Sequence, residues 1–189
     1  MASWLLMAIA DSREEAMDSA VFIETPDESF AEIISRTLKI KGIPTRSSED
    51  GRDILTHLAD CSIGVVLLDI RNHYEKALNV LRAIKHAAPE TEVLLINRPY
   101  NIWIAVEGMR AGASDEITVP LDTEALAAKV TEARIRAASA KKAARKNIFR
   151  TFSNAMSAAT FAQAGEFDTA IRMLEADRKE NESDDGSGQ

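Results

Sequence analysis

Short apolar runs and stretches of helical periodicity alternate along the chain from Ala20 to Leu121. Apolar runs predict strands, and apolar residues three and four positions apart predict helices. The expected strands are Ala20–Ile23, Ile43–Arg46, Ile63–Leu68, Glu92–Ile96 and Glu116–Thr118. The expected helices are Ser29–Ile40, Ser48–Leu58, Lys76–Ala87, Ile102–Ala111 and one that begins near Asp122. This alternation predicts an α/β fold with a five-stranded, parallel, doubly wound sheet and helices on both faces.

The last helix is expected to continue well beyond the sheet domain, because no Gly or Pro occurs between Pro120 and Gly165. Apolar residues recur in it at steps of three and four, which indicates a surface for packing; they are Leu126, Val130, Ala133, Ala137, Ala140 and Ala144. Residues 157–177 resemble a single helical hairpin of the tetratricopeptide kind, with its turn at Gly165. One such unit is not stable alone. We therefore expect the hairpin to dock on the rest of the chain or on another chain.

Both ends of the chain have a distinct composition. The first ten residues are apolar at nine positions, which favours a short helix from Ser3 to about Met17. No Lys or Arg precedes this short run, so an export signal is not expected; translation from Met17 remains an alternative. Residues 179–189 contain no apolar residue and are predicted to be disordered. The expected parts are 1–19, the sheet domain at 20–135, the helical extension at 136–178 and the tail.

Composition narrows the class of protein further. The chain has 189 residues, a net charge of -7 and one cysteine, Cys61. A single cysteine excludes an intrachain disulfide and a multi-cysteine zinc site, and it fits a reducing compartment. No apolar stretch has the length of a membrane span. We therefore expect a cytoplasmic protein without a membrane partner, and the negative charge argues against a dominant nucleic-acid surface.

Function in an open parallel sheet is expected at the carboxyl ends of the strands. The segments VVLLDI (65–70) and EGMRAGASDEITVPL (107–121) occupy this region. They resemble the third strand of a bacterial response regulator receiver domain and the family's stretch from the fourth helix to its Lys-Pro pair. The resemblance covers about residues 20–135 and implies a flavodoxin-like fold. It also implies that Asp69 is the candidate phosphate acceptor for a histidine kinase in a two-component phosphorelay.

The resemblance also implies a set of partners for Asp69 that this sequence largely lacks. Receivers hold Mg²⁺ with two acidic residues after the first strand, with the acceptor aspartate and with a backbone carbonyl; a hydroxyl residue and a lysine bind the phosphoryl group. The equivalent positions here are Thr25 and Pro26 for the acidic pair, Arg71 for the carbonyl, Asn97 for the hydroxyl, and Val119, before Pro120, for the lysine. We therefore expect a degenerate receiver with no resident metal or cofactor, and with Mg²⁺ only if Asp69 is phosphorylated.

Two arginines follow strand ends near the same site. Arg71 or Arg98 could pair with Asp69 and lower the pKa of its carboxyl, since an opposite charge nearby favours ionisation. Exposed aromatic residues at the start of the fourth helix would be anchors for a partner. In receivers, partners contact this region, so the candidate surface contains Tyr100, Trp103 and Glu116, which stands at the family's aromatic switch position. The alternative for Trp103 is packing on the core.

Three functions follow from these observations. The first is a degenerate receiver that acts as an interaction or dimerisation module, with a histidine kinase or another signalling protein as partner. The second is a conventional regulator phosphorylated at Asp69. The third is a nucleic-acid-binding regulator that uses the basic helix 134–150, although no base-reading motif accompanies it. We expect no enzyme, because no nucleophile–base pair or metal cluster is present. We expect a homodimer held by the helical extensions.

Overall fold

The computed structural model describes residues 19–48, 52–59, 63–163, 167–169, 171–172 and 175. Helices and strands alternate as the sequence predicts. The elements are β1 (Ala20–Glu24), α2 (Glu28–Ile40), β2 (Thr45–Ser48), α3 (Arg52–Ala59), β3 (Ile63–Asp69), α4 (Tyr74–Ala87), β4 (Glu92–Asn97), α5 (Ile102–Arg110), β5 (Asp115–Thr118) and α6 (Thr123–Gln163).

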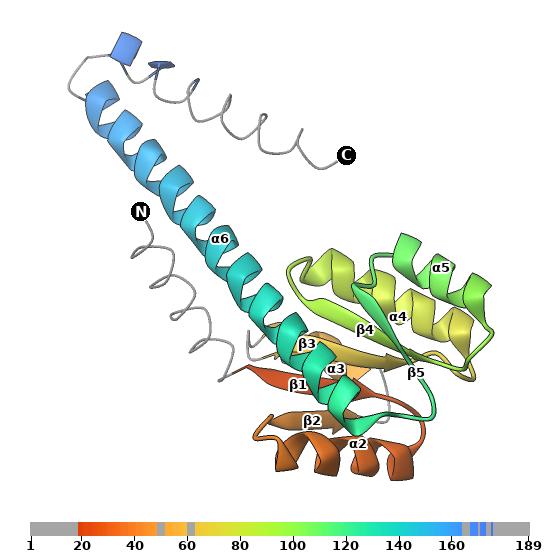
Figure 1. The fold of residues 1–189 in the computed structure, drawn as a ribbon. Helices are drawn as coiled ribbons and strands as arrows, with labels where there is room; N and C mark the ends of the chain where they lie inside the picture. The colour runs from red at the N-terminus through yellow and green to blue at the C-terminus, as the bar shows by residue number, and fades with distance from the viewer. Residues whose placement is uncertain are drawn as a thin grey trace. The chain divides into compact units, whose positions relative to one another are not determined.

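The five strands form one parallel sheet in the order β2-β1-β3-β4-β5 (Figure 1). Every residue of β1 and β3 is buried. Strands covered by helices on both faces bury the side chains that point either way, which explains their continuous apolar runs. The predicted α/β, doubly wound fold is confirmed.

Two apolar clusters lie on opposite faces of the sheet. Residues of α3, α4 and α5 form the first cluster with one set of strand side chains. Residues of α2 and of the first turns of α6 form the second cluster with the alternate set. Both clusters are continuous through the central strands. The sheet is therefore a firm support for the loops at its carboxyl edge.

The second strand lies two residues later than predicted, at Thr45–Ser48. Gly42 has a φ of 74°, and the amide of Ile43 donates to the carbonyl of Leu38 at 3.0 Å, so the chain turns sharply after α2. Glycine enters this left-handed conformation without steric cost. Ile43 then fills the core next to α2, and the polar sequence that follows pairs with β1 as an edge strand.

α6 is a continuous helix from Thr123 to Gln163, and the carboxylate of Asp122 accepts the amide of Ala125 at 2.8 Å at its start. Leu126, Val130 and Ala133 belong to the second apolar cluster. The first half of the predicted apolar repeat therefore packs against the sheet domain of the same chain and is not exposed for pairing with a second helix. The chain divides into two compact units, residues 1–141 and 142–189, and α6 contributes to both.

Some predictions fall outside the described residues. These are the N-terminal helix, Cys61, the hairpin turn at Gly165 and the tail. In the part of the chain that the structure describes, no helix combines the length and the apolarity needed to cross a membrane.

Candidate functional site

Asp69 is the last residue of β3, the middle strand of the sheet. Its side chain is 1% exposed. Thr25 follows β1 directly, and its hydroxyl donates to Asp69 Oδ2 at 2.7 Å. The sheet therefore places a buried carboxylate at the edge where the function of such folds is found.

Arg71 closes over this carboxylate. Its Nε donates to Asp69 Oδ1 at 2.9 Å and its Nη2 donates to Oδ2 at 2.7 Å, so the guanidinium binds both oxygens. The backbone amide of Arg71 donates to Oδ1 at 3.0 Å. Together with Thr25, these bonds give each oxygen two donors. A carboxylate has about four lone-pair sites, so the hydrogen-bonding capacity of Asp69 is filled from within the protein.

The first turn of α2 holds the guanidinium from its other side. Arg71 Cζ lies 3.7 Å from the centroid of the Phe30 ring, which is a cation–π arrangement. Arg71 Nη2 also lies 3.7 Å from Asp27 Oδ2. Asp27 is itself fixed as the N-cap of α2, because its Oδ1 accepts the amide of Phe30 at 3.0 Å. The arginine is therefore positioned by three groups and not by its partner alone.

The protonation states follow from these contacts. Burial favours the neutral form of Asp69, but the hydrogen bonds from the side chain and the amide of Arg71 and from Thr25 outweigh it and lower the pKa of the carboxyl. The hydrogen bonds to Asp69 raise the pKa of Arg71. The pair is thus fully ionised at neutral pH, and the prediction that an arginine pairs with Asp69 describes Arg71.

Arg98 has a different partner. Its Nη2 donates to Asn72 Oδ1 at 2.9 Å on the surface. Arg71, and not Arg98, is therefore the arginine that pairs with Asp69.

The residues at the positions predicted for the Mg²⁺ ligands do not fit a receiver-type Mg²⁺ site, because Asp69 alone among them has a side-chain carboxylate. Thr25 uses its hydroxyl for Asp69, and Pro26 has no oxygen in its side chain. Mg²⁺ requires free oxygen ligands in near-octahedral geometry. The carboxylate oxygens of Asp69 already accept bonds from a cation. The described residues contain no group of three or more His, Cys, Asp or Glu side chains that could hold a metal.

Asn97 and Glu116 join the ends of β4 and β5. Asn97 is fully buried, and its Nδ2 donates to Glu116 Oε1 at 2.7 Å and to the carbonyl of Asn101 at 3.2 Å. Its Oδ1 accepts the amide of Arg98 at 2.8 Å. Glu116 therefore points toward Asn97, and one amide side chain ties β5 to the loop before α5.

Val119 is the residue that the resemblance predicts at the family's lysine position. It packs against the second apolar cluster, and its amide donates to the carbonyl of Asn97 at 3.0 Å. The peptide bond to Pro120 is cis. This position offers no cation to a phosphoryl group on Asp69.

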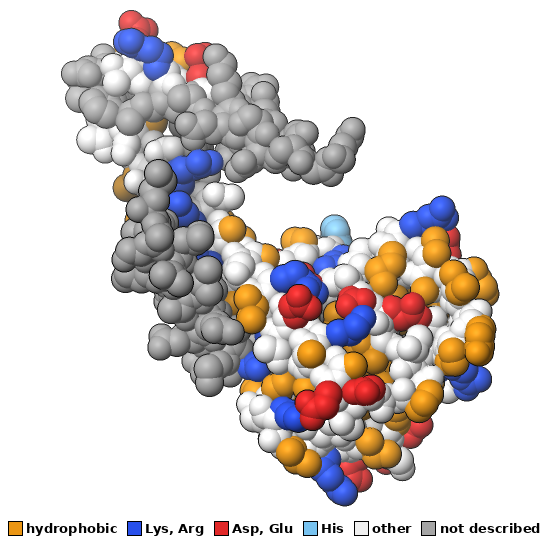
Figure 2. Space-filling model, viewed as in Figure 1, with side chains coloured by type: hydrophobic (Ala, Val, Ile, Leu, Met, Phe, Trp, Pro, Cys, Tyr) orange, Lys and Arg blue, Asp and Glu red, His pale blue; other side chains and the backbone are white. Residues whose placement is uncertain are grey.

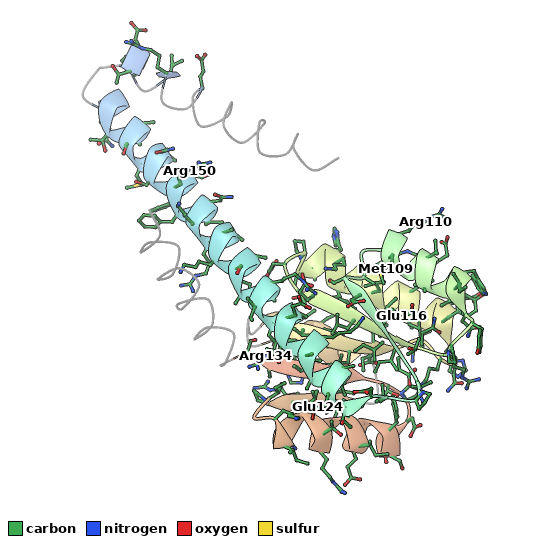
Figure 3. The ribbon with its side chains drawn as sticks, in the orientation of Figure 1. Met109, Arg110, Glu116, Glu124, Arg134 and Arg150 are labelled. Atoms are coloured by element: carbon green, nitrogen blue, oxygen red, sulfur yellow. The ribbon has the colours of Figure 1, made fainter. Side chains whose placement is uncertain are left out.

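An apolar surface covers α5 and the loop before it (Figure 2). Tyr100 is 94% exposed, and Ile102 and Trp103 are also exposed. Trp103 does not enter the core; its ring meets Tyr74 edge to face at 5.0 Å. A groove beside them is lined by residues that include Val106, Met109, Arg110 and Glu116. Figure 3 labels the last three of these residues.

No sequence pattern predicts the contacts of Phe30 and Asp27 with Arg71. In the sequence, Phe30 is one apolar residue of the expected helix Ser29–Ile40, and Asp27 lies just before that helix. A local signal for the capping was present, since Asp three residues before an amide at a helix start is a common N-cap. The contact with Arg71 depends on how the loop after β3 folds. That loop has no apolar periodicity from which its path could be predicted.

The topology and the carboxylate at the end of the middle strand define the class: a doubly wound α/β signalling domain of the receiver type. The family model for the response regulator receiver domain matches residues 21–131. The chain belongs to this family, whose members are modules of two-component signalling and use Mg²⁺ when phosphorylated.

Named relatives agree with this assignment. The transcriptional regulatory protein DltR of Streptococcus agalactiae is 31% identical over 104 residues, which cover 55% of this chain and 46% of DltR. The regulatory protein AtoC of Escherichia coli is 28% identical over 106 residues, which cover 56% of this chain and 23% of AtoC. The chain thus spans less than half the length of these two relatives.

A solved structure shows the same fold. The receiver domain of NtrX from Brucella abortus superposes with a TM-score of 0.55 at 26% identity, covering 60% of this chain and 97% of the NtrX domain. The likeness therefore concerns the receiver domain.

Proposed function

We propose that the chain is a degenerate receiver that acts as a protein-interaction module without phosphorylation of Asp69. The observation that carries this proposal is the complete occupation of the Asp69 carboxylate by Arg71 and Thr25. An aspartate must present a free oxygen lone pair to attack a phosphoryl group. Here a bidentate guanidinium competes for both oxygens, and such pairs are among the strongest hydrogen bonds in proteins.

The groups that stabilise phosphoryl transfer are replaced as well. A transferred phosphoryl group carries negative charge, which metal ions and positively charged side chains neutralise. Val119 is uncharged and Pro26 cannot hold Mg²⁺. The Mg²⁺ that phosphorylated receivers use therefore has no ready site here. No catalytic role is proposed.

The surface of α5 is the proposed contact for a partner, which would be a histidine kinase or another signalling protein. Exposed apolar side chains at this surface, Tyr100 and Ile102 among them, suit a protein interface. Charges of both signs, Arg98, Arg110 and Glu116, line the same groove, so a mainly apolar partner segment would fit it best. The bond between Asn97 and Glu116 supports a surface held in one arrangement. The sequence argues against nucleic acid as the main partner and predicts a cytoplasmic location. Both statements stay predictions.

Exposure to acetyl phosphate and Mg²⁺ tests this proposal. Intact-mass spectrometry of the full chain should show no stoichiometric phosphoryl group on the native protein. Asp69→Asn is the matched control, because it keeps the shape of the side chain and removes the acceptor oxygen. A stoichiometric acyl phosphate on the native chain that disappears in Asp69→Asn would instead establish the conventional regulator.

A second readout addresses the surface. Amide NMR signals of Asn97, Tyr100 and Glu116 should not move when beryllofluoride and Mg²⁺ are added at millimolar concentration. Saturable shifts at these residues would show that the surface responds to a phosphoryl-like group and would contradict the proposal.

A further inference from the structure

The second half of α6 exposes a large apolar stripe within the unit of residues 142–189. Ile148, Phe149, Phe152 and Met156 are between 56% and 72% exposed. Steps of four residues connect Ile148, Phe152 and Met156, so these side chains lie on one face of the helix, with Phe149 beside them. Exposed apolar patches of this kind usually mark an interface.

The charges on the same helix are distributed unevenly. Lys142, Arg145, Lys146 and Arg150 are its only charged residues from 142 to 150, and residues 151–163 carry no charge. In a parallel pair of identical helices, each cation would lie beside its own copy. In an antiparallel pair centred on Phe152, residue 142 lies opposite 162, and residue 150 lies opposite 154. All four cations then face uncharged positions of the second chain.

The apolar residues match in the same antiparallel register. Phe152 lies opposite its own copy on the two-fold axis, and Ile148 lies opposite Met156. Phe149 lies opposite Ala155, a small residue that leaves room for a ring. Apolar side chains therefore meet along the whole stripe, as a two-fold interface requires of a self-complementary surface.

The area available is sufficient for a modest dimer. With about 150–250 Å² for a large side chain and the exposed fractions of these four residues, they expose roughly 390–650 Å² per chain. Two copies would bury about 1,000 Å², which is near the lower limit for a specific interface. Exposed Ala144 and Ala159 extend the contact and let the helices approach closely.

We infer that two copies of this chain pair through the second half of α6, as antiparallel helices centred on Phe152. The partner is thus a second copy of the chain. The inference rests on residues 142–163 alone and does not depend on the state of Asp69.

Sedimentation equilibrium of the full chain tests the pairing. The native protein should have the mass of a dimer at tens of micromolar, and Phe152→Glu should have the mass of a monomer. Asn147→Glu is the matched control, because it places the same charge in the same turns on an exposed position away from the stripe, and it should remain a dimer. A native monomer, or a Phe152→Glu variant that dimerises like the native chain, would overturn the inference. A native monomer that binds anionic lipid vesicles through this stripe would also overturn the inference, and it would show that the stripe is a membrane-surface helix.

A distance measurement tests the orientation. A spin label at Gln163→Cys, with Cys61→Ala, should report a separation of about 33 Å along the axis in the antiparallel pair, from 1.5 Å per residue. A parallel pair would bring the two labels to about 10 Å. The short distance would refute the antiparallel arrangement even if the protein is a dimer.

Discussion

Replacing Arg71 by Met removes the cation from Asp69 and keeps an unbranched apolar stem on Phe30. Two of the four hydrogen bonds to the carboxylate are lost, and those from Thr25 and from the backbone amide remain. Removing one member of a buried ion pair usually costs about 3–5 kcal/mol, because the other charge stays buried. Arg71 is 15% exposed and half of the bonds persist, so we expect a loss of about 2–3 kcal/mol at neutral pH.

The dependence on pH identifies the cause of this loss. In the native chain the pKa of Asp69 is lowered on folding, so its contribution to stability is present above the unfolded value of 3.8 and is lost as the pH falls through the folded value. In the variant, burial without the guanidinium raises the folded pKa, so the ionised carboxyl destabilises the protein at neutral pH and protonation relieves it. The difference between native and variant chains should therefore shrink as the pH falls from neutral toward about 4.

Urea unfolding followed by far-ultraviolet circular dichroism, across this pH series, measures the effect. Arg98→Met is the matched control, because Arg98 bonds the exposed Asn72, and it should change stability by no more than about 0.5 kcal/mol. The double variant Asp69→Asn/Arg71→Met should be less destabilised than the sum of the two single variants, since they remove one interaction. A loss below about 1 kcal/mol, or one that is equal at all pH values, would refute the reasoning and make the pair an ordinary surface ion pair.

Two other substitutions test the surroundings of the site. Gly108→Ala should cost about 1–3 kcal/mol in urea unfolding, because a Cβ there would clash with Cδ1 of the fully buried Leu95; a change below about 0.5 kcal/mol would show that the Leu95 side chain repacks freely. Asn97→Ala should cost about 1–2 kcal/mol and shift the amide NMR signals of Glu116 and Asn101, because their oxygens lose a buried donor. Unchanged signals at both residues would show that this side chain does not tie β5 to α5.

The inner strands were predictable because strands buried on both faces have nearly continuous apolar sequences. The predicted strands Ile63–Leu68 and Glu92–Ile96 each contain a long apolar run, and the structure extends each strand by only one residue. The edge strand was harder. Its polar sequence, TRSS, pairs with β1 alone, so its composition does not indicate a buried strand. The apolar Ile43 was therefore included in the predicted strand, which begins two residues before β2.

The candidate site was predictable in its location but not in its contacts. The end of β3 singled out Asp69, and the sequence left Arg71 and Arg98 as equal candidates for its partner. The loop after β3 decides between them, since it folds so that both the amide and the guanidinium of Arg71 reach the carboxylate. A contact of this kind depends on the path of a few loop residues. No pattern of apolar and polar positions records that path.

A buried carboxylate needs a compensating cation, because an isolated charge is costly in a protein interior. In the receivers that this chain resembles, Mg²⁺ and a lysine supply that charge and leave an oxygen of the aspartate available for phosphoryl transfer. Here Arg71 supplies it from two residues along the same chain, and it is always charged. The same guanidinium that replaces the metal also occupies the oxygens that the metal would leave open. Under the proposed function, the absence of the acidic pair and of the lysine and the presence of Arg71 have one consequence: the carboxylate is part of a fixed structure.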